Sequence, residues 1–459
     1  MPFRSDRART ALAVALPLAA LATLPAAAQT QPPKTAKPDS KIKLTLDASA
    51  RLRFEELSGQ FRPGLPADDT FLSMRTIVAA KLGLGPVTIA GELVDSRGYI
   101  ESGRSSVRTS EINDLEPAQA YVSVDTGRFG SITAGKFSMD IGGQRLVART
   151  DFPNGVQSYL GVMTDWRDKA KNRLTLFWTR PFAALPEAPQ DIYDNKVELD
   201  RAATNTVFFG GSGTLAQAFG KTGVELFAYR LAEQDRTTHP TRNRHLVTFG
   251  TRIRRAPAKA SLDYEFEGAL QRGTARATAA ASDRRDLDVH AGFAHAEFGY
   301  SFPKGWKPRI SAMFDYASGD SADPNTYNRF DTLFGSRRAD FGPLSLFGPV
   351  SRANLVSPGM RIEAKASPRF DVMAAVRGLW LADKTDSFGV TGVRDRNGRA
   401  GDFAGVQAEL RARRWLKPSK IKLEAGAAYL GRGRFLRDAP NAAHNGDTVY
   451  GYTDLTISF

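Results

Sequence analysis

The chain has 459 residues, among them 63 Lys and Arg, 49 Asp and Glu and no cysteine, so its formal net charge is +14. The lack of cysteine excludes a disulfide framework. The positive charge favours anionic partners. However, the basic residues are dispersed and no nucleic-acid-binding motif occurs, which argues against a nucleic acid as the partner. No stretch of about 18 apolar residues occurs, so the sequence predicts no transmembrane helix.

Residues 1–28 have the pattern of a secretory signal peptide. Arginines at positions 4, 7 and 9 form a basic region, an apolar stretch covers 11–24, and three alanines at 26–28 precede a cleavage site. Removing this segment takes away a net charge of +2 and leaves about +12. Residues 29–40 are rich in Pro and Lys and have no apolar period, so we predict that they form a disordered lead-in.

From residue 41 to residue 459 the chain is a series of segments in which apolar and polar residues alternate. A period of two is that of a β-strand whose two faces meet different environments. This region is therefore predicted to be all-β. The alternating segments are 42–49, 74–81, 87–93, 118–125, 129–138, 155–165, 173–180, 198–210, 223–232, 244–254, 259–269, 287–301, 308–317, 356–366, 369–382, 403–413, 420–430 and 448–459, which makes about 18 strands.

The connections between these segments alternate in length. Those after odd-numbered segments are long, as in 96–116 and 318–355, and most of those after even-numbered segments are short, as in 83–86 and 367–368. One even connection, 211–222, is too long, and we interpret it as a turn that contains a short helix. This alternation indicates a transmembrane antiparallel β-barrel with short periplasmic turns and long extracellular loops. A soluble sandwich or propeller, the alternative, gives no reason for it. A barrel of about 18 strands leaves an aqueous channel.

The last segment supports the same architecture. Every second residue from Val449 to Phe459 is mainly apolar, the residues between them are mainly polar, and the chain ends on the aromatic ring of Phe459. This pattern resembles the C-terminal strand of bacterial outer-membrane barrels, the segment that the barrel assembly machinery recognises. An ordinary edge strand of a soluble sheet is the alternative. We therefore expect the assembly machinery, outer-membrane lipid and lipopolysaccharide as partners.

The alternation also assigns side chains to the lipid or to the lumen. A charge on the lipid side near the membrane midplane costs about 2–4 kcal/mol, so the charged sets are expected to face inward. Aromatic residues near strand ends, namely Trp166, Trp178, Trp380, Trp415 and Tyr452, fit interfacial girdles. The inward set on five of the strands is Arg309, Ser311, Met313, Asp315, Arg361, Glu363, Lys365, Asp371, Arg377, Gln407, Glu409, Arg411, Lys422 and Glu424.

Two stretches, 135–182 and 313–334, resemble the alginate export family of outer-membrane proteins. The residues that carry the resemblance are Gly143, Gln144, Arg145, Thr150, Asp151, Phe152, Asn154, Tyr316, Ala317, Ser318, Gly319, Asp320, Phe330, Leu333 and Phe334. The resemblance implies an 18-stranded barrel with a basic constriction that passes an anionic polysaccharide. It constrains the kind of pore more closely than it constrains the cargo.

The candidates for lining the pore or binding a solute are mostly basic. Three of them, Lys136, Arg145 and Arg149, lie in or beside the long connection after the fifth segment, and an inward fold of that connection would narrow the channel with positive charge. Solvated loop positions and salt-bridge ladders along the wall are the alternatives for these residues. The candidates are Lys136, Arg145, Arg149, Arg309, Asp315, Arg361, Arg377 and Arg411.

Other chemistry has less support in the sequence. Asp320 and Asp323, with Asp315 nearby, offer carboxylates of the kind that bind Ca²⁺, although a plain polar loop is the preferred interpretation. No serine has a recognisable nucleophile context, so we do not expect an enzyme, and no cofactor is predicted.

Together these features predict an outer-membrane channel for anionic solutes in a Gram-negative bacterium. Export of an anionic, alginate-like polysaccharide is the first interpretation. The alternatives are a general or selective porin that takes up small anions or sugars, and an adhesin or receptor built on a barrel.

Overall fold

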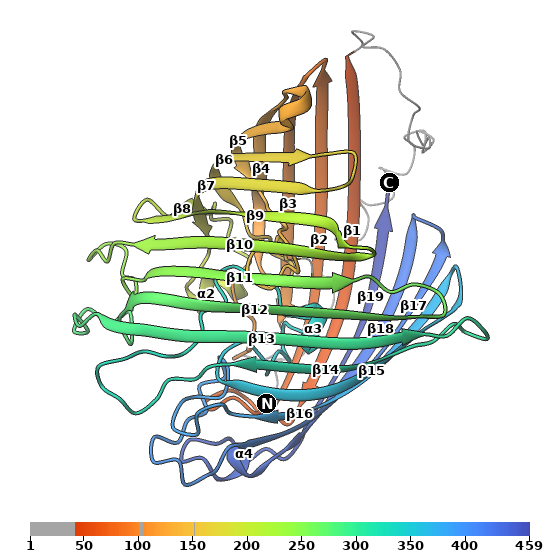
Figure 1. Ribbon diagram of the computed structural model, residues 1–459. Coiled ribbons are helices and arrows are strands. Elements are labelled where there is room, and N and C mark those ends of the chain that lie inside the picture. The colour runs from red at the N-terminus through yellow and green to blue at the C-terminus, as the bar shows by residue number, and fades with distance from the viewer. Residues whose placement is uncertain (1–41, 101–103, 151) are drawn as a thin grey trace, which may run out of the picture.

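A computed structural model describes residues 42–100, 104–150 and 152–459. The predicted signal peptide, the lead-in and Asp151 lie outside these residues. Eighteen strands form one closed antiparallel barrel (Figure 1). It closes because β1 pairs with β19, with Ser49 opposite Ser458 and Ser58 opposite Val449. A further two-residue strand, β8, pairs only with the end of β7.

The strands are longer than the alternating segments suggested, with 16 residues in β1 and 17 in β2. Among the described residues the helices are short and lie in connections: η2 Gly127–Phe129, α2 Pro189–Tyr193, α3 Arg338–Phe341 and α4 Arg434–Asp438. None of the described helices has the length and apolar character needed to cross a membrane. The strands are β1 Lys43–Ser58, β2 Asp68–Leu84, β3 Val87–Ile100, β4 Asn113–Asp125, β5 Ser131–Phe137, β6 Tyr159–Arg167, β7 Arg173–Ala183, β8 Arg201–Ala202, β9 Thr206–Phe219, β10 Thr222–Glu233, β11 His245–Arg255, β12 Ser261–Ala275, β13 Leu287–Ser301, β14 Arg309–Ala317, β15 Leu355–Ser367, β16 Phe370–Trp380, β17 Phe403–Lys417, β18 Ile421–Arg432 and β19 Thr448–Ser458.

The connections alternate between short turns at one end of the barrel and long loops at the other. The prediction of a long turn with a helix at 211–222 is wrong, because β9 continues to Phe219 and only residues 220–221 separate it from β10. The sequence Gly210-Gly211-Ser212-Gly213 carries too few side chains to show the alternation. Its backbone nevertheless pairs with both β7 and β10. The alternation of loop lengths therefore holds for the connections between the described barrel strands.

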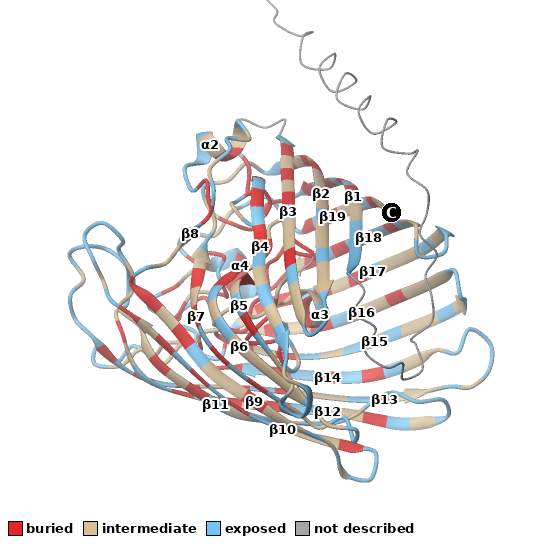
Figure 2. Ribbon diagram, turned by 90° about the horizontal axis from the view of Figure 1, so that it is seen from above, coloured by how far each residue is buried: buried red, intermediate tan, exposed pale blue. Residues whose placement is uncertain are grey.

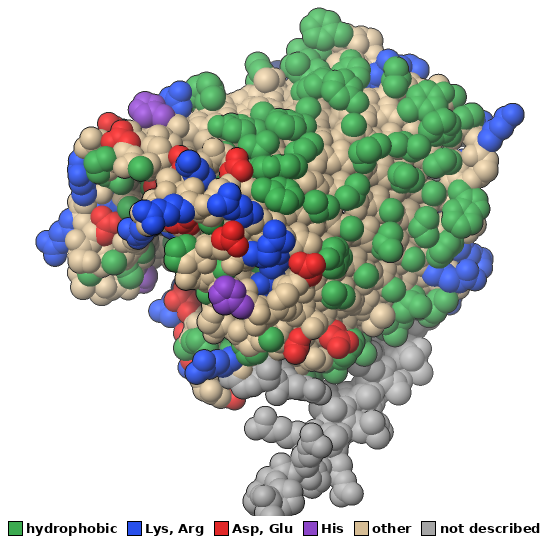
Figure 3. Space-filling view, turned by 90° about the horizontal axis from the view of Figure 1, so that it is seen from below, with side chains coloured by type: hydrophobic (Ala, Val, Ile, Leu, Met, Phe, Trp, Pro, Cys, Tyr) green, Lys and Arg blue, Asp and Glu red, His purple; other side chains and the backbone are tan. Residues whose placement is uncertain are grey.

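The outer wall is apolar, as the alternation predicts. Figure 3 shows hydrophobic side chains over most of the wall on the face it presents, with charged side chains gathered toward one end. Burying this surface in lipid and keeping charge off it satisfies the main energetic demand on a membrane barrel. Large hydrophobic side chains exposed on the wall include Leu46, Leu52, Phe54, Leu226, Leu262, Leu410 and Val449.

One aromatic residue is not where we predicted it. Tyr452 does not belong to an interfacial girdle but is 3% exposed and faces the lumen, where its ring packs edge-on against Phe152 at 5.7 Å. Its hydroxyl donates to Glu424 at 2.8 Å. The reason is parity, because Tyr452 belongs to the same inward set of β19 as Tyr450 and Asp454, both of which are buried.

The two ends of the barrel give a direct test of its orientation. Epitope tags inserted at Asp323 or Asn397, in the long loops, are expected to be accessible to antibody on intact cells. Tags at Lys169 or Ser419, in short turns, are expected to be protected until the outer membrane is permeabilised. All four side chains are exposed, so burial within the protein does not bias the comparison. Labelling at Lys169 with protection at Asp323 would invert the orientation.

Candidate functional site: the loop-filled lumen

Two long loops fold into the barrel instead of standing above it. We call residues 138–158, between β5 and β6, the first inward loop, and residues 318–354, between β14 and β15, the second inward loop. Figure 2 shows α3, which belongs to the second inward loop, inside the ring of strands. Arg338 of α3 forms an ion pair with Glu409 of β17 at 2.6 Å. Farther along the same loop, the hydroxyl of Ser345 donates a hydrogen bond to Glu55 of β1 at 2.5 Å. The second inward loop therefore crosses the lumen.

The two inward loops are joined to each other through their backbones. Phe334 N donates to Leu146 O at 3.0 Å, Ala148 N donates to Phe334 O at 3.0 Å, and Val147 and Phe334 form a parallel bridge. Because both segments use their main chains, the junction holds them in one register. The pair acts as a single constriction.

Asp340 is the charged centre of this constriction. Its carboxylate accepts from Arg145 at 2.9 and 3.1 Å and also from Arg352, while its carbonyl accepts from Arg377 of β16 at 2.5 Å. Arg145 continues the network to Glu265 and to its neighbour on the inner face of β12, Glu267, at 2.5 and 2.6 Å. The Asp340 carboxylate thus joins the two inward loops, and the Asp340 carbonyl and the Arg145 side chain tie them to β16 and β12 of the wall.

The protonation states in this network follow from the pairing. Burial by itself would raise the pKa of Asp340, but the guanidiniums of Arg145 and Arg352 hold it well below its usual range. In the same way burial would lower the pKa of Arg145, and the carboxylates of Asp340, Glu267 and Glu265 raise it. Asp340 and Arg145 are therefore both charged at neutral pH, and their pairing stabilises the docked loops.

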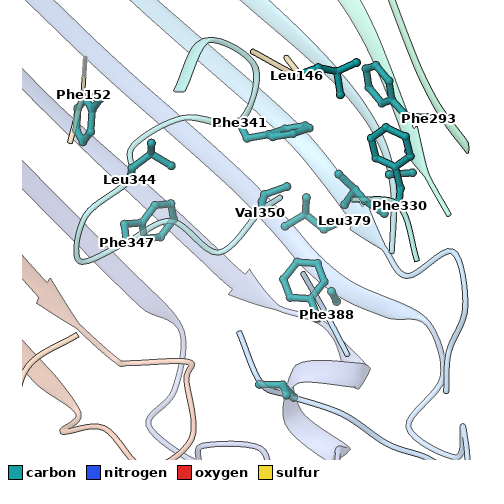
Figure 4. Packing of buried hydrophobic residues seen from close by; sticks show 14 of the residues in the cluster. Leu146, Phe152, Phe293, Phe330, Phe341, Leu344, Phe347, Val350, Leu379 and Phe388 are labelled. Carbon is teal, nitrogen blue, oxygen red and sulfur yellow. The ribbon is translucent and has the colours of Figure 1, made fainter. Parts of the chain in front are cut away.

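Apolar packing supports the charged centre. Figure 4 shows side chains of the second inward loop, among them Phe341, Leu344 and Phe347, gathered with wall and loop residues such as Leu379 and Phe388. Phe347 is fully buried and stacks on Tyr450 at 5.4 Å. Burial of large aromatic side chains is worth about 1.5–3 kcal/mol each, so the loops are held by more than charge.

Most of the predicted basic residues are neutralised where they lie. Lys136 pairs with Glu116 and lies 3.7 Å from the ring of Phe182, and Arg149 pairs with Glu92 at 2.7 Å. Arg309 contacts three carboxylates, the nearest at 2.5 Å. The interpretation as salt bridges that brace the wall therefore describes these residues. The connection after β5 folds inward, which the sequence left open, but the charges of Arg145 and Arg149 are compensated there.

Two of the predicted arginines differ from the rest. Arg361 of β15 donates to the carbonyl of Ala339 at 2.6 Å, and within the described residues it has no carboxylate at ion-pair distance. Arg411 of β17 has no ion pair there either, and its Nε is buried without a hydrogen-bond partner. These guanidiniums face the lumen beside α3 and supply positive charge that the protein itself does not cancel.

Asp315 and Arg377, which the sequence placed in the lumen, face each other there. Arg377 Nη1 lies 3.4 Å from Asp315 Oδ2, and His295 Nδ1 lies 2.7 Å from Asp315 Oδ1. All three side chains are at most 3% exposed. They form a buried cluster under α3 and leave no open coordination site at Asp315.

The residues of the family resemblance position the inward loops. Gln144 has a φ of 60° and its carbonyl accepts from Ser336 at 2.8 Å, which joins the two loops. Asn154 is fully buried, and its Oδ1 accepts a hydrogen bond from Arg51 of β1 at 2.5 Å. Phe334 packs on Phe208 at 4.9 Å. These residues therefore set the shape of the constriction, whichever solute passes.

The start of the second inward loop is polar. A Cβ at Gly319 would lie 2.1 Å from Asn354 Oδ1, so only glycine fits there without a shift. Asp320 accepts from Asn328 N at 3.1 Å, and burial and Asp386 raise its pKa. Asp323 is exposed. Within the described residues no group of three or more His, Asp or Glu side chains is arranged to hold a metal.

Several functional residues were missed by sequence reasoning. Arg51 and Arg53 of β1 donate to the carbonyl of Phe152 at 3.1 and 2.8 Å and so anchor the first inward loop to the wall. Their parity would have placed them in the lumen, because they alternate with Leu52 and Phe54. Asp340, the centre of the constriction, lies in the four-residue helix α3 of a long loop, which is too short for a period to give a signal.

The lumen is not filled at the short-turn end of the barrel. A cavity of about 410 Å³ lies there, lined among others by Asp47, Lys81, Glu92 and Lys420. Its walls carry both signs of charge. The lumen is thus divided into an open chamber at the short-turn end and a loop-filled constriction nearer the long loops.

A closed barrel with an apolar belt and a charged lumen narrowed by loops defines an outer-membrane channel of the porin type. The chain belongs to the alginate export family, whose sequence model matches residues 42–449. No curated protein sequence matched the chain.

Solved channels share the fold at low sequence identity. Pseudomonas aeruginosa OccK9 (OpdG) has a TM-score of 0.59 and 12% identity over 91% of this chain and 98% of its own. Acinetobacter baumannii OccAB1 has a TM-score of 0.58 and 12% identity over 91% and 96%. P. aeruginosa OccK2 (OpdF), in complex with glucuronate, has a TM-score of 0.57 and 12% identity over 90% and 98%. At this identity the likeness shows the fold alone.

Proposed function

We propose that this outer-membrane channel passes anionic carbohydrate, and that its cargo is an anionic polysaccharide of the alginate type. The observation that carries the proposal is the pair Arg361 and Arg411, whose positive charge in the lumen has no carboxylate partner among the described residues. A low-dielectric wall focuses the field of such charges, so a few of them are effective. Family membership and the net charge of +14 support the same class of solute.

A second candidate is a channel for single sugar acids or other small anions. It is favoured by the extent to which the inward loops fill the lumen, since Phe330, Phe341 and Phe347 are at most 2% exposed in this state. A polymer would require these loops to move, whereas a monomer needs a smaller opening. The two candidates differ in the solute length at which passage stops.

Ion selectivity tests the shared part of both candidates. In planar bilayers with a salt gradient the reversal potential is expected to indicate preference for anions. Arg361→Glu and Arg411→Glu should each reduce the anion-to-cation permeability ratio by about twofold or more, because each reverses an uncompensated lumen charge. The effect should shrink at high salt, where charges are screened. Arg284→Glu, an exposed loop position, is the matched control and should leave the ratio unchanged.

Oligouronates of increasing length separate the candidates. Long oligomers are added on either side of the bilayer. If they block the channel current transiently, and if voltage relieves the block by driving them through the channel, the result supports the polysaccharide as cargo. Block by glucuronate alone, with no effect of longer oligomers, would favour the small-anion channel. A cation-selective wild-type channel would reject both.

A further inference from the structure

A second group of arginines lies away from the residues discussed above, on the long-loop side of the constriction. Arg62, Arg108 and Arg337 line a cavity of about 350 Å³ between the β1–β2 loop, the β3–β4 loop and the two inward loops. We call it the arginine cavity. Arg108 is exposed and Arg337 is half-buried, so the cavity is reached from the long-loop side, while Arg62, at 8% exposure, forms its inner part.

The positions of the inner arginines are built into the fold. Arg62 donates to Leu346 O at 2.9 Å and to Phe347 O at 2.5 Å, and its guanidinium lies 4.5 Å from the ring of Phe61. Arg337 donates to Val350 O at 3.4 Å. Both groups therefore hold their place through neutral carbonyls. Such contacts orient a guanidinium but leave its charge uncancelled.

The cluster lacks counter-charge. Within the described ranges none of the three guanidiniums lies at ion-pair distance from a carboxylate. Burial, together with Arg108 and Arg337, lowers the pKa of Arg62 to about 9, against a smaller opposing effect of Asp69. Burial, with Arg352 and Arg108, lowers the pKa of Arg337 to about 10. Like charges held together without a partner are costly unless an anion joins them.

The carboxyl group that lines the cavity does not supply that partner. Burial and the nearby carboxylate of Glu55 raise the pKa of Glu111 to about 7, against the opposing effect of Arg53 and Arg51. Within the described residues Glu111 also forms no ion pair with any of the three guanidiniums. The rest of the lining offers what a sugar ring needs, with hydroxyl and amide groups from Thr109 and Gln157 and an apolar surface from Leu344.

We propose that the arginine cavity is a docking subsite for one carboxylate-bearing sugar unit, held before or after it crosses the constriction. The inference rests on the proposed function and adds to it a site at which the solute binds on its way through the channel. The planar fork of a guanidinium matches a carboxylate in two parallel hydrogen bonds. The volume lies within the usual range of small-ligand sites, about 300–1,000 Å³, and accommodates a single sugar acid.

Binding to the purified full chain in detergent micelles tests the subsite without requiring transport. Glucuronate, glucose and inorganic phosphate are titrated by calorimetry. We expect glucuronate to bind at least about tenfold more tightly than glucose, and Arg108→Gln and Arg337→Gln each to weaken glucuronate binding about tenfold or more. Arg284→Gln, an exposed arginine in another long loop, should bind as the wild type does. Heat-modifiable migration on gels confirms that each variant is a folded barrel.

Each contrary result has a distinct meaning. Equal binding of glucuronate and glucose, or unaltered binding by both cavity variants, would overturn the subsite. Phosphate binding as tight as glucuronate binding would reduce it to an unselective anion site and overturn its assignment to a sugar unit. Retained glucuronate binding in a cation-selective channel would reject the proposed function but not the subsite. An anion-selective channel without that binding would reject the subsite alone.

Discussion

Replacing Asp340 with alanine is expected to release the second inward loop and to raise single-channel conductance. The substitution removes the one carboxylate that pairs with Arg352 among the described residues, and it leaves Arg145 with Glu265 and Glu267 alone, in a place where both arginine side chains are buried. Removing one partner of a buried ion pair typically costs about 3–5 kcal/mol, because the other charge remains buried and unpaired. That cost falls on the docked state of the loops and not on the barrel wall, so the barrel should still assemble.

The measurement is conductance in planar bilayers, with heat-modifiable migration as the test of assembly. Asp340→Asn, which keeps an acceptor but not the charge, should give a smaller increase. Asp438→Ala is the control, because its pair with Arg434 at 3.4 Å is mostly exposed and surface pairs are worth about 0–1 kcal/mol. Conductance equal to wild type in Asp340→Ala would mean that apolar packing alone holds the constriction.

The same network predicts how the constriction responds to pH. The pKa of Asp340 is lowered in the folded state, so its contribution is fully present above the ordinary aspartate value of about 3.9 and is lost only as the pH falls toward the lowered value. We therefore expect the Asp340 network to add no pH dependence to the conductance between about pH 5 and 8. Opening within that range would have to arise from other groups.

Substituting Gly335 by alanine is expected to separate the two inward loops. A Cβ at this position would lie 1.7 Å from the carbonyl oxygen of Arg145 and 2.3 Å from its carbonyl carbon, and both are backbone atoms that cannot rotate away. The shift must break the backbone hydrogen bonds between Phe334 and its neighbours in the first inward loop. Buried backbone groups left unpaired cost about 1–3 kcal/mol each, so the junction should open.

A disulfide between the loops reports on this junction. The backbones of Gln144 and Ser336 share a hydrogen bond of 2.8 Å, so both positions are replaced by cysteine. Because the chain has no cysteine of its own, any disulfide that forms within it joins these two positions. Oxidative crosslinking should be efficient in the otherwise wild-type chain and strongly reduced when Gly335→Ala is added. Gly451→Ala, on the outward face of β19 with no atom within 4 Å, should leave it unchanged. Undiminished crosslinking with Gly335→Ala would show that the loops tolerate the added methyl.

The sequence by itself determined the barrel, its strand order and the face on which most strand residues lie. The physical reason is local: a strand between lipid and lumen must alternate, and a lipid-facing charge is too costly to keep. Arg309, Asp315, Arg377 and Glu409 were placed inward on that ground, and all four are buried or half-buried in the lumen. The alternation gave no signal in the glycine-rich part of β9, and it did not show the full length of strands such as β1 and β2.

Only the tertiary structure decided what fills the lumen and which charges remain free. Arg309 and Arg361 have the same parity and the same chemistry, yet the first meets three carboxylates and the second meets a carbonyl of α3. Asp340 lies in the short helix α3 of the second inward loop and Arg337 directly precedes it, and in such a loop position along the chain carries no information about neighbours. Their partners come from strands and loops far apart in the sequence, so the constriction and the arginine cavity exist only once the barrel has closed around the inward loops.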